Sequence, residues 1–199
     1  MFTENWYSDK QAEYLQTLSR NVRDLKGAII EIGCWQGKST IALANACYPE
    51  EVHAVDHWLG NLDEDRNHES VQLASKRDVF MEFKLNIEKF TNGNIIPWRM
   101  DWREFMRQWA EKSGRSIKFC HIDACHDYRS VHDNIQAVLP FLVSGGIVCG
   151  DDFLTSNLSR RDLDGGVERA VRELLPGFSN HDNLWYWIKI TDHRPNKFL

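Results

Sequence analysis

Apolar positions along the chain follow two spacings in turn, and this alternation predicts a succession of strands and helices. Short apolar runs with β-branched residues predict five buried strands, at 27–32, 51–56, 94–98, 117–123 and 147–152. Apolar residues three or four positions apart predict helices at 8–25, 38–48, 79–90, 105–112, 131–142 and 167–174. A last segment, 184–190, has the pattern of a half-exposed strand.

Strands that alternate with helices predict a mainly parallel sheet with right-handed crossovers and helices on both faces. We therefore expect a doubly wound, Rossmann-like α/β fold. The chain has 199 residues and no repeat, low-complexity tract or linker, which predicts one domain over 1–199. The N-terminal helix, within residues 1–26, would cover either one face of the sheet or a partner subunit. In the second case the protein would be a homo-oligomer.

The segment 57–78 interrupts this pattern because it is polar and acidic and has no clear periodicity. A loop of this length inside a compact domain is usually functional or disordered. We interpret it as an active-site flap, and a solvated excursion is the alternative.

Composition narrows the class of protein. The net charge of −5 disfavours nucleic acid held mainly through its phosphates and leaves a small neutral or cationic substrate open. Five cysteines without framework spacing predict reduced thiols, and no apolar run approaches the length of a membrane span. The sequence also lacks a signal-peptide pattern. We expect a cytoplasmic protein that acts on a small molecule and binds neither membrane nor nucleic acid.

The first predicted strand leads through two glycines into a helix, in the segment Glu31-Ile-Gly-Cys-Trp-Gln-Gly37. Such a turn places backbone N–H groups and the positive end of a helix beside a bound ligand. The next strand ends at Asp56, where a carboxylate accepts hydrogen bonds from ribose hydroxyls in doubly wound folds. A dinucleotide fold would have G-x-G-x-x-G, whereas this turn has G-x-x-x-G. Alternatively, the glycines serve only a turn that needs positive φ.

Carboxylates end the fourth and fifth predicted strands, at Asp123 and at the pair Asp151-Asp152. If these strands are neighbours, their ends lie about 5 Å apart at the carboxyl edge, where open α/β sheets bind ligands. Three carboxylates repel one another unless a cation neutralises them, and oxygen ligands favour Mg²⁺, Mn²⁺ or Ca²⁺ over zinc. In the alternative, Asp123 only contacts ligand or loop amides, while Asp151 or Asp152 caps the following segment.

These motifs resemble those of the class I S-adenosylmethionine-dependent methyltransferases, and in particular the metal-dependent O-methyltransferases. The resemblance rests on the glycine turn, on the segment 122–128 (IDACHDY) and on the segment 150–153 (GDDF). It implies a seven-stranded sheet, S-adenosylmethionine as cofactor and a divalent metal held by Asp123, Asp151 and Asp152. It also implies a set of cofactor contacts at Glu31, Gly33, Cys34, Trp35, Gly37, Ser39, Asp56, His57, Asp101 and Trp102.

Two of the implied roles leave alternatives. Asp101 would bind the adenine amino group, but Asp is also a favoured N-cap for the helix that follows. In catechol-type members a lysine three residues after the Asp of strand four is the general base, and here His126 holds that position. Histidine is chemically suited to this role, because the unperturbed pKa of an imidazole lies near working pH. In sugar-type members the pattern is Asp-Gly-Asp-His, and Cys125 stands where the second Asp would be. Whether Asp123 is a ligand or a base, and whether His126 is a base or a ligand, therefore stays open.

We predict an enzyme that transfers a methyl group to a hydroxyl of a small molecule, preferably a sugar or glycoside, with a catechol or phenol as the alternative. A nicotinamide-dependent oxidoreductase would need a denser glycine loop and a Tyr-x-x-x-Lys set, and the sequence has neither. A nucleic-acid methyltransferase would have Asn/Asp-Pro-Pro-Tyr where this chain has Asp-Ala-Cys-His. A non-catalytic, cofactor-binding partner subunit is a further alternative, which the cysteine at position 125 favours.

Overall fold

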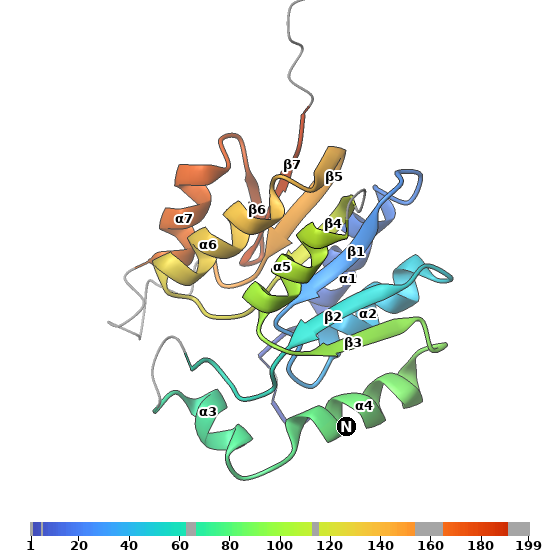
Figure 1. Cartoon of the computed structure of the whole chain (residues 1–199), viewed down its shortest axis with the longest axis vertical. Coiled ribbons are helices and arrows are strands. Elements are labelled where there is room, and N and C mark those ends of the chain that lie inside the picture. The colour runs from blue at the N-terminus through green and yellow to red at the C-terminus, as the bar shows by residue number, and fades with distance from the viewer. Residues whose placement is uncertain (1, 5, 63–66, 113–115, 154–164, 191–199) are drawn as a thin grey trace, which may run out of the picture.

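A seven-stranded sheet with the strand order β3-β2-β1-β4-β5-β7-β6 forms the centre of the protein (Figure 1). The structure is a computed structural model that describes residues 2–4, 6–62, 67–112, 116–153 and 165–190. The strands are β1 Ala28–Ile32, β2 Val52–Asp56, β3 Ile95–Arg99, β4 Ile117–Ile122, β5 Leu142–Gly150, β6 Ser179–His181 and β7 Leu184–Ile188. The strands β1 to β5 are parallel, and β7 and β6 close one edge as an antiparallel pair.

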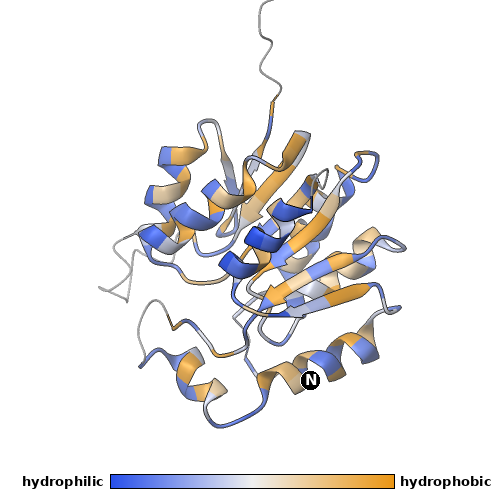
Figure 2. Ribbon diagram, in the orientation of Figure 1, coloured by the Kyte–Doolittle hydropathy of each residue, from blue (hydrophilic) through white to orange (hydrophobic). Residues whose placement is uncertain are grey.

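Helices cover both faces of this sheet (Figure 1). The helices in the described ranges are α1 Asp9–Arg20, α2 Lys38–Cys47, α3 Glu69–Ala74, α4 Val79–Phe90, α5 Trp102–Glu111, α6 Tyr128–Val138 and α7 Gly166–Leu174. Figure 2 shows apolar residues concentrated on the strands and polar residues on the outer sides of the helices. The predicted doubly wound, mainly parallel seven-stranded fold is confirmed.

Successive side chains of each strand point to opposite faces of the sheet, and each face packs against its own set of helices. Ile30, Cys120 and Val148 belong to a core cluster with α5, α6 and α7. Their neighbours Ile29 and Phe119 belong to the opposite cluster, with α1 and α2. The N-terminal helix therefore covers a face of its own sheet, as expected for one of its two predicted roles.

The predicted neighbourhood of the fourth and fifth strands is confirmed. In the register of β4 and β5, Ile122 pairs with Gly150, so both strands end at the same level. β1 pairs with β4 on the other side, and Ile32 lies opposite Ile122. The carboxyl ends of β1, β4 and β5 therefore lie side by side, and the residues after them share one edge of the sheet.

Two predicted helices are shorter in the structure than their apolar pattern indicates. The helix predicted at 8–25 ends at Arg20, and turns follow it. The helix predicted at 131–142 ends at Val138, because Leu142 already pairs with Ile117 as the first residue of β5. The segment 144–146, which falls between the predicted helix and the predicted strand, lies inside β5, where Gly145 and Gly146 exchange backbone hydrogen bonds with Lys189.

Two further elements have weak sequence signals. The predicted loop 57–78 contains the short helix α3, whose N-cap is His68; residues 63–66 of this segment lie outside the described ranges. Strand β6 is polar and exposed, so it has no apolar period, and it forms through a hairpin with β7. Asp182 and Asn183 make that hairpin turn with φ values of 47° and 75°, as a type I′ turn requires.

No helix in the described part of the chain has the length and apolar character that a membrane crossing needs. All five cysteines are free thiols, which agrees with the absence of a disulfide framework in the sequence.

A matched pair of glycine substitutions tests the packing at the end of β5. A methyl group at Gly150 would overlap the carbonyl oxygen of Ile122 and the ring of Trp185, whereas one at Gly93 meets nothing within 4 Å. We expect Gly150→Ala to lower the free energy of unfolding by about 3 kcal/mol through overpacking. Gly93→Ala should cost about 1 kcal/mol, the strain of its positive φ. Urea denaturation with equal m-values measures both, and equal losses would contradict the packing described here.

Candidate active site

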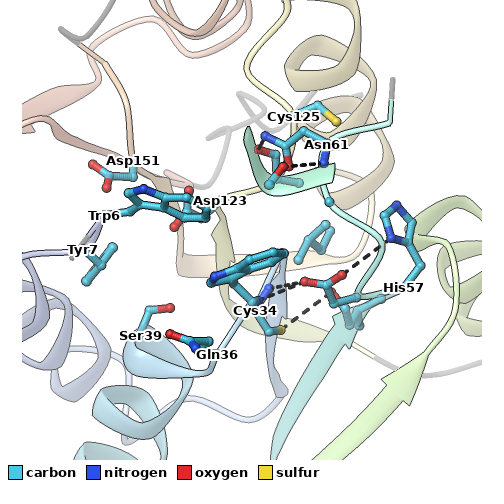
Figure 3. Close-up of a pocket in the computed structure, with 18 of the residues that line it drawn as sticks. Trp6, Tyr7, Cys34, Gln36, Ser39, His57, Asn61, Asp123, Cys125 and Asp151 are labelled. Atoms are coloured by element: carbon cyan, nitrogen blue, oxygen red, sulfur yellow. Dashed lines mark hydrogen bonds and ion pairs between the residues drawn. The ribbon is translucent and has the colours of Figure 1, made fainter. Parts of the chain in front are cut away.

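A cavity of about 410 Å³ lies at the carboxyl edge of the sheet (Figure 3). This volume is typical of small-molecule sites, and the position is the one at which open α/β sheets bind ligands. Its walls come from the N-terminal segment, the turn between β1 and α2, the segment that follows β2, the start of α5 and the ends of β4 and β5.

The glycine turn lets β1 approach the end of β4. Gly33 has φ 85°, and a Cβ atom there would overlap the carbonyl oxygen of Asp123. The Asp123 N–H donates to the carbonyl of Ile32 at 2.8 Å, which fixes the two strand ends together. Gly37 is the left-handed N-cap of α2 and supplies no capping side chain, so the first N–H groups of α2 adjoin the cavity beside Ser39.

Asp56 organises the loops around the predicted ribose site. One carboxylate oxygen accepts hydrogen bonds from the N–H groups of Cys34 and Trp35 at 2.9 and 3.0 Å. The other oxygen accepts from the N–H of Trp58 at 2.6 Å. Asp56 also lines the cavity, and a carboxylate has further lone pairs for a ligand. It is therefore placed both to hold the loops and to accept a hydrogen bond from a ligand.

Glu31 does not lie where the motif implies. Its side chain is fully buried and does not line the cavity. The structure therefore contradicts the expected direct contact between Glu31 and the cofactor. Its carboxylate instead accepts a hydrogen bond from Thr40 of α2 and pairs with Nδ1 of His121 at 2.9 Å. Gly37 also lies outside the cavity lining. A Cβ atom there would lie 2.9 Å from the ring of Phe83, so this glycine contributes to the shape of the turn.

The other predicted cofactor residues line the cavity. Asp101 is the N-cap of α5, where its carboxylate accepts from the N–H of Arg103 at 2.7 Å, and it also borders the cavity next to Trp102. His57 borders it too, and its Nδ1 accepts from the N–H of Leu59 at 3.0 Å. Both expected roles of Asp101 are therefore compatible with its position.

The structure brings together a different set of potential metal ligands from the predicted one. Ligand atoms of Asp123, His126 and Asp152 all lie within 4.8 Å of one another, and the three side chains are half-buried. Nε2 of His126 lies 2.9 Å from Asp152 and 3.9 Å from Asp123. Cys125 borders the same cavity but is not part of this cluster.

Asp151 is not part of this cluster and is buried against the N-terminal helix. Its Oδ1 accepts a hydrogen bond from Nε2 of Gln11 at 2.6 Å and another from Asn183 at 3.4 Å. Burial raises the pKa of Asp151 well above its ordinary value, and the negative charges of Asp123 and Asp152 raise it further. Asp151 still borders the cavity, so it remains in contact with the space that a ligand would fill.

The N-terminal segment forms a wall of the cavity that was not among the predicted site elements. The residues concerned, all on the cavity lining, are Phe2, Glu4, Trp6 and Tyr7. Glu4 is held by Arg77 at 2.5 Å and by the indole N–H of Trp35 at 3.1 Å. One signal was present in the sequence: Ser8-Asp-Lys-Gln11 is a capping box, which marks the start of α1 directly after Tyr7. Other lining residues without a sequence signal are Gln36, Lys38, Asn61, His68, Ser70 and Asn134.

Known proteins resemble this chain in both sequence and fold. Residues 30–153 match a family model described as a methyltransferase domain. Among curated protein sequences, none matches the chain. Solved structures with a similar fold include CalS11, a calicheamicin methyltransferase, at 19% identity and a TM-score of 0.68, covering 91% of this chain and 80% of that one. The O-methyltransferase NovP has 16% identity and a TM-score of 0.64, covering 92% and 80%. An O-methyltransferase from Bacillus cereus in complex with SAH has 17% identity and a TM-score of 0.59, covering 92% and 82%.

The fold and the site define a class I methyltransferase architecture, with the glycine turn and the acidic strand ends at one edge of the sheet. The chain belongs to the methyltransferase-domain family. The family and fold inferred from the sequence motifs are thus confirmed, and the fold is shared with O-methyltransferases of solved structure.

The buried carboxyl of Asp151 generates a prediction for the metal-free protein. An acid whose pKa is raised by folding binds its proton more tightly in the folded state, so its contribution to stability falls as the pH rises above the ordinary carboxyl range. Asp151→Asn removes that penalty and keeps an acceptor oxygen for Gln11. We expect the variant to have a higher Tm than the wild type at pH 8 and a smaller advantage at pH 4, measured with chelator present.

Asp24→Asn is the control for this comparison, because the Asp24 side chain is 93% exposed and the substitution should give no gain. A lower Tm for Asp151→Asn at pH 8 would show that the folded protein stabilises the charge of Asp151, contrary to the expectation.

Proposed function

We propose that this protein transfers a methyl group from S-adenosylmethionine to a hydroxyl group of a small molecule, with the help of a divalent metal ion. The observation that carries the proposal is the meeting of Asp123, His126 and Asp152 in the cavity that the glycine turn and Asp56 also border. A cofactor-binding edge and a cluster of proton-accepting groups then share one space, as methyl transfer to a hydroxyl requires.

The cavity offers a place for each part of the cofactor. The uncapped N-terminus of α2 at Ser39 suits a carboxylate, and Asp56 suits the ribose hydroxyls. Asp101 and Trp102, at the other side of the glycine turn, suit the adenine. The Bacillus cereus enzyme of similar fold was solved with SAH, which supports this class of cofactor.

The acidic cluster fits a hard divalent cation. Asp123 and Asp152 supply carboxylate oxygens, which favour Mg²⁺, Mn²⁺ or Ca²⁺. Asp151 borders the same cavity but already accepts hydrogen bonds from Gln11 and Asn183, so we do not propose it as a direct ligand of the metal ion. When bound there, such an ion lowers the pKa of an acceptor hydroxyl and orients it.

His126 is the proposed general base. Its Nε2 lies within hydrogen-bonding distance of Asp152, at 2.9 Å, and the imidazole borders the cavity. A neutral imidazole near Asp123 and Asp152 takes the proton of the acceptor hydroxyl, and the neighbouring carboxylates stabilise the imidazolium that forms. The remaining task of the chain is alignment, because methyl transfer from a sulfonium is an in-line displacement.

A sugar or glycoside hydroxyl is the acceptor that we favour. CalS11, whose fold resembles this one, is described as a TDP-rhamnose 3′-O-methyltransferase. A catechol or phenol hydroxyl is the alternative, and a panel of methyl glycosides and catechols distinguishes the two by release of S-adenosylhomocysteine.

Calorimetric titration of S-adenosylhomocysteine, with Mg²⁺ and again with chelator, tests the proposal. We expect micromolar binding and a change in affinity when Mg²⁺ is removed. The Mg²⁺-dependent change should disappear in Asp152→Asn and persist in Asp133→Asn, a control on the surface of α6. No binding under either condition would contradict the cofactor assignment, and equal binding in all cases would contradict the metal assignment.

Removing the proposed base should change the pH dependence of turnover. We expect His126→Ala to reduce the rate by a factor of about 10² at neutral pH, because general-base catalysis is lost. The reduction should be smaller at pH 9 to 10, where hydroxide replaces the base. Initial rates of S-adenosylhomocysteine release across this range measure the effect, with His132→Ala on α6 as the control. An unchanged rate at neutral pH would exclude His126 as the base.

A further inference from the structure

Tyr7 is a buried polar residue on the cavity wall for which the proposed mechanism has no role. Its side chain is 6% exposed, and among the described residues its hydroxyl has no hydrogen-bond partner. Its ring lies edge-on to the imidazole of His121, with 5.7 Å between ring centroids. Leaving a buried hydroxyl without a partner costs about 1 to 3 kcal/mol, so a ligand that fills the cavity is expected to supply the missing hydrogen bond.

The surroundings of this hydroxyl are anionic. Burial raises the pKa of the Tyr7 phenol well above its ordinary value, and the negative charges of Asp151 and then Asp123 raise it further. The phenol therefore stays neutral, and its oxygen is free to accept a hydrogen bond. A cationic hydrogen-bond donor is the partner that suits a neutral oxygen next to two carboxylates.

The position of Tyr7 within the cavity indicates which group of a ligand could be this hydrogen-bond donor. Figure 3 shows Tyr7 on the same side of the pocket as Asp151 and Ser39, away from His57. Ser39 lies in the first turn of α2, where a carboxylate is favoured, and His57 follows the proposed ribose site at the end of β2. A group that lies next to a carboxylate and is itself cationic is the ammonium of an α-amino acid.

We propose that Tyr7 is a cofactor-binding residue whose phenol oxygen accepts a hydrogen bond from the α-ammonium group of the amino-acid end of S-adenosylmethionine. This inference rests on the proposed function. It assigns to the N-terminal segment a part in recognising the cofactor, in addition to closing one side of the cavity.

The start of α1 holds Tyr7 in place for this contact. Ser8 is the N-cap of α1 and accepts a hydrogen bond from the N–H of Gln11 at 3.2 Å, while the Gln11 side chain returns one to the N–H of Ser8 at 2.8 Å. The same Gln11 side chain donates to Asp151 at 2.6 Å. One capping box therefore fixes the phenol and the neighbouring carboxylate relative to each other before a ligand binds.

Three ligands that differ at the amino-acid end test the assignment by calorimetry at fixed Mg²⁺. S-adenosylhomocysteine carries the ammonium and the carboxylate, S-adenosyl-3-thiopropylamine carries the ammonium alone, and 5′-methylthioadenosine carries neither. We expect Tyr7→Phe to weaken the first two by about 10- to 100-fold, the effect of losing one hydrogen bond to a charged group, and to leave the third unchanged. Tyr14→Phe, on α1 and stacked on His181, should bind all three like the wild type.

The outcomes separate this contact from a packing role and from the proposed function. Tyr7→Phe keeps the ring and removes a hydroxyl without a partner, so the Tm of the ligand-free variant should equal or exceed that of the wild type. Equal weakening of all three ligands, weakening of S-adenosylhomocysteine alone, or no weakening would each overturn the ammonium contact while leaving the cofactor assignment intact. If the wild type binds none of the three, the proposed function fails and this inference fails with it.

Discussion

The buried contact of Glu31 with Thr40 and His121 is the constraint on which the candidate site depends. Glu31 lies on β1, Thr40 on α2 and His121 on β4, so one carboxylate joins the three elements that surround the glycine turn. Glu31 and His121 are both fully buried, and loss of one partner from a buried pair of this kind typically costs about 3 to 5 kcal/mol. The contact adds to the backbone pairing of β1 with β4 next to the point where Gly33 lies against the backbone of Asp123.

The central strands and their order could be predicted from the sequence because both faces of the sheet are buried. Strand β4 is buried at every position, and the apolar residues Ile117, Phe119, Cys120 and Ile122 make it recognisable as a central strand although Lys118 and His121 interrupt them. Leu142 shows where this reasoning fails, because its spacing from Ile135 is helical although its backbone pairs with Ile117. Strand β6 had no apolar pattern at all, since its three residues are exposed and its hydrogen bonds come from β7.

The role of Glu31 shows why the site was only partly predictable. The structure places Glu31 directly opposite His121 in the register of β1 and β4, and this register shifts at Ala28 and Ile29. A shift of one residue moves a side chain to the other face of a sheet, so the pairing could not be read from spacing. The motif correctly located the turn, but the residue of β4 that lies opposite this carboxylate depended on a register shift that the sequence did not reveal.

The two acids at the end of β5 separate for a similar reason. Neighbouring residues of an extended strand point to opposite faces, so Asp151 and Asp152 cannot share a direction unless the backbone turns. Asp152 has φ 63°, and it reaches His126, while Asp151 reaches Gln11, 140 positions away along the chain. No local pattern encodes a contact over such a separation. The adjacent carboxylates therefore led to the prediction that both are ligands of one metal ion.

Under the proposed function, this arrangement of carboxylates also explains how the site distinguishes the cofactor before and after reaction. The metal ion, the sulfonium and the α-ammonium group are all cations, and Asp123, Asp151 and Asp152 border the cavity that they would occupy. Methyl transfer converts the sulfonium into a neutral thioether, so the attraction of the carboxylates for that part of the ligand is lost at the moment of reaction. The same rigid edge that concentrates negative charge then favours the charged cofactor over its product, since Coulomb attraction is stronger in a partly buried site than in water.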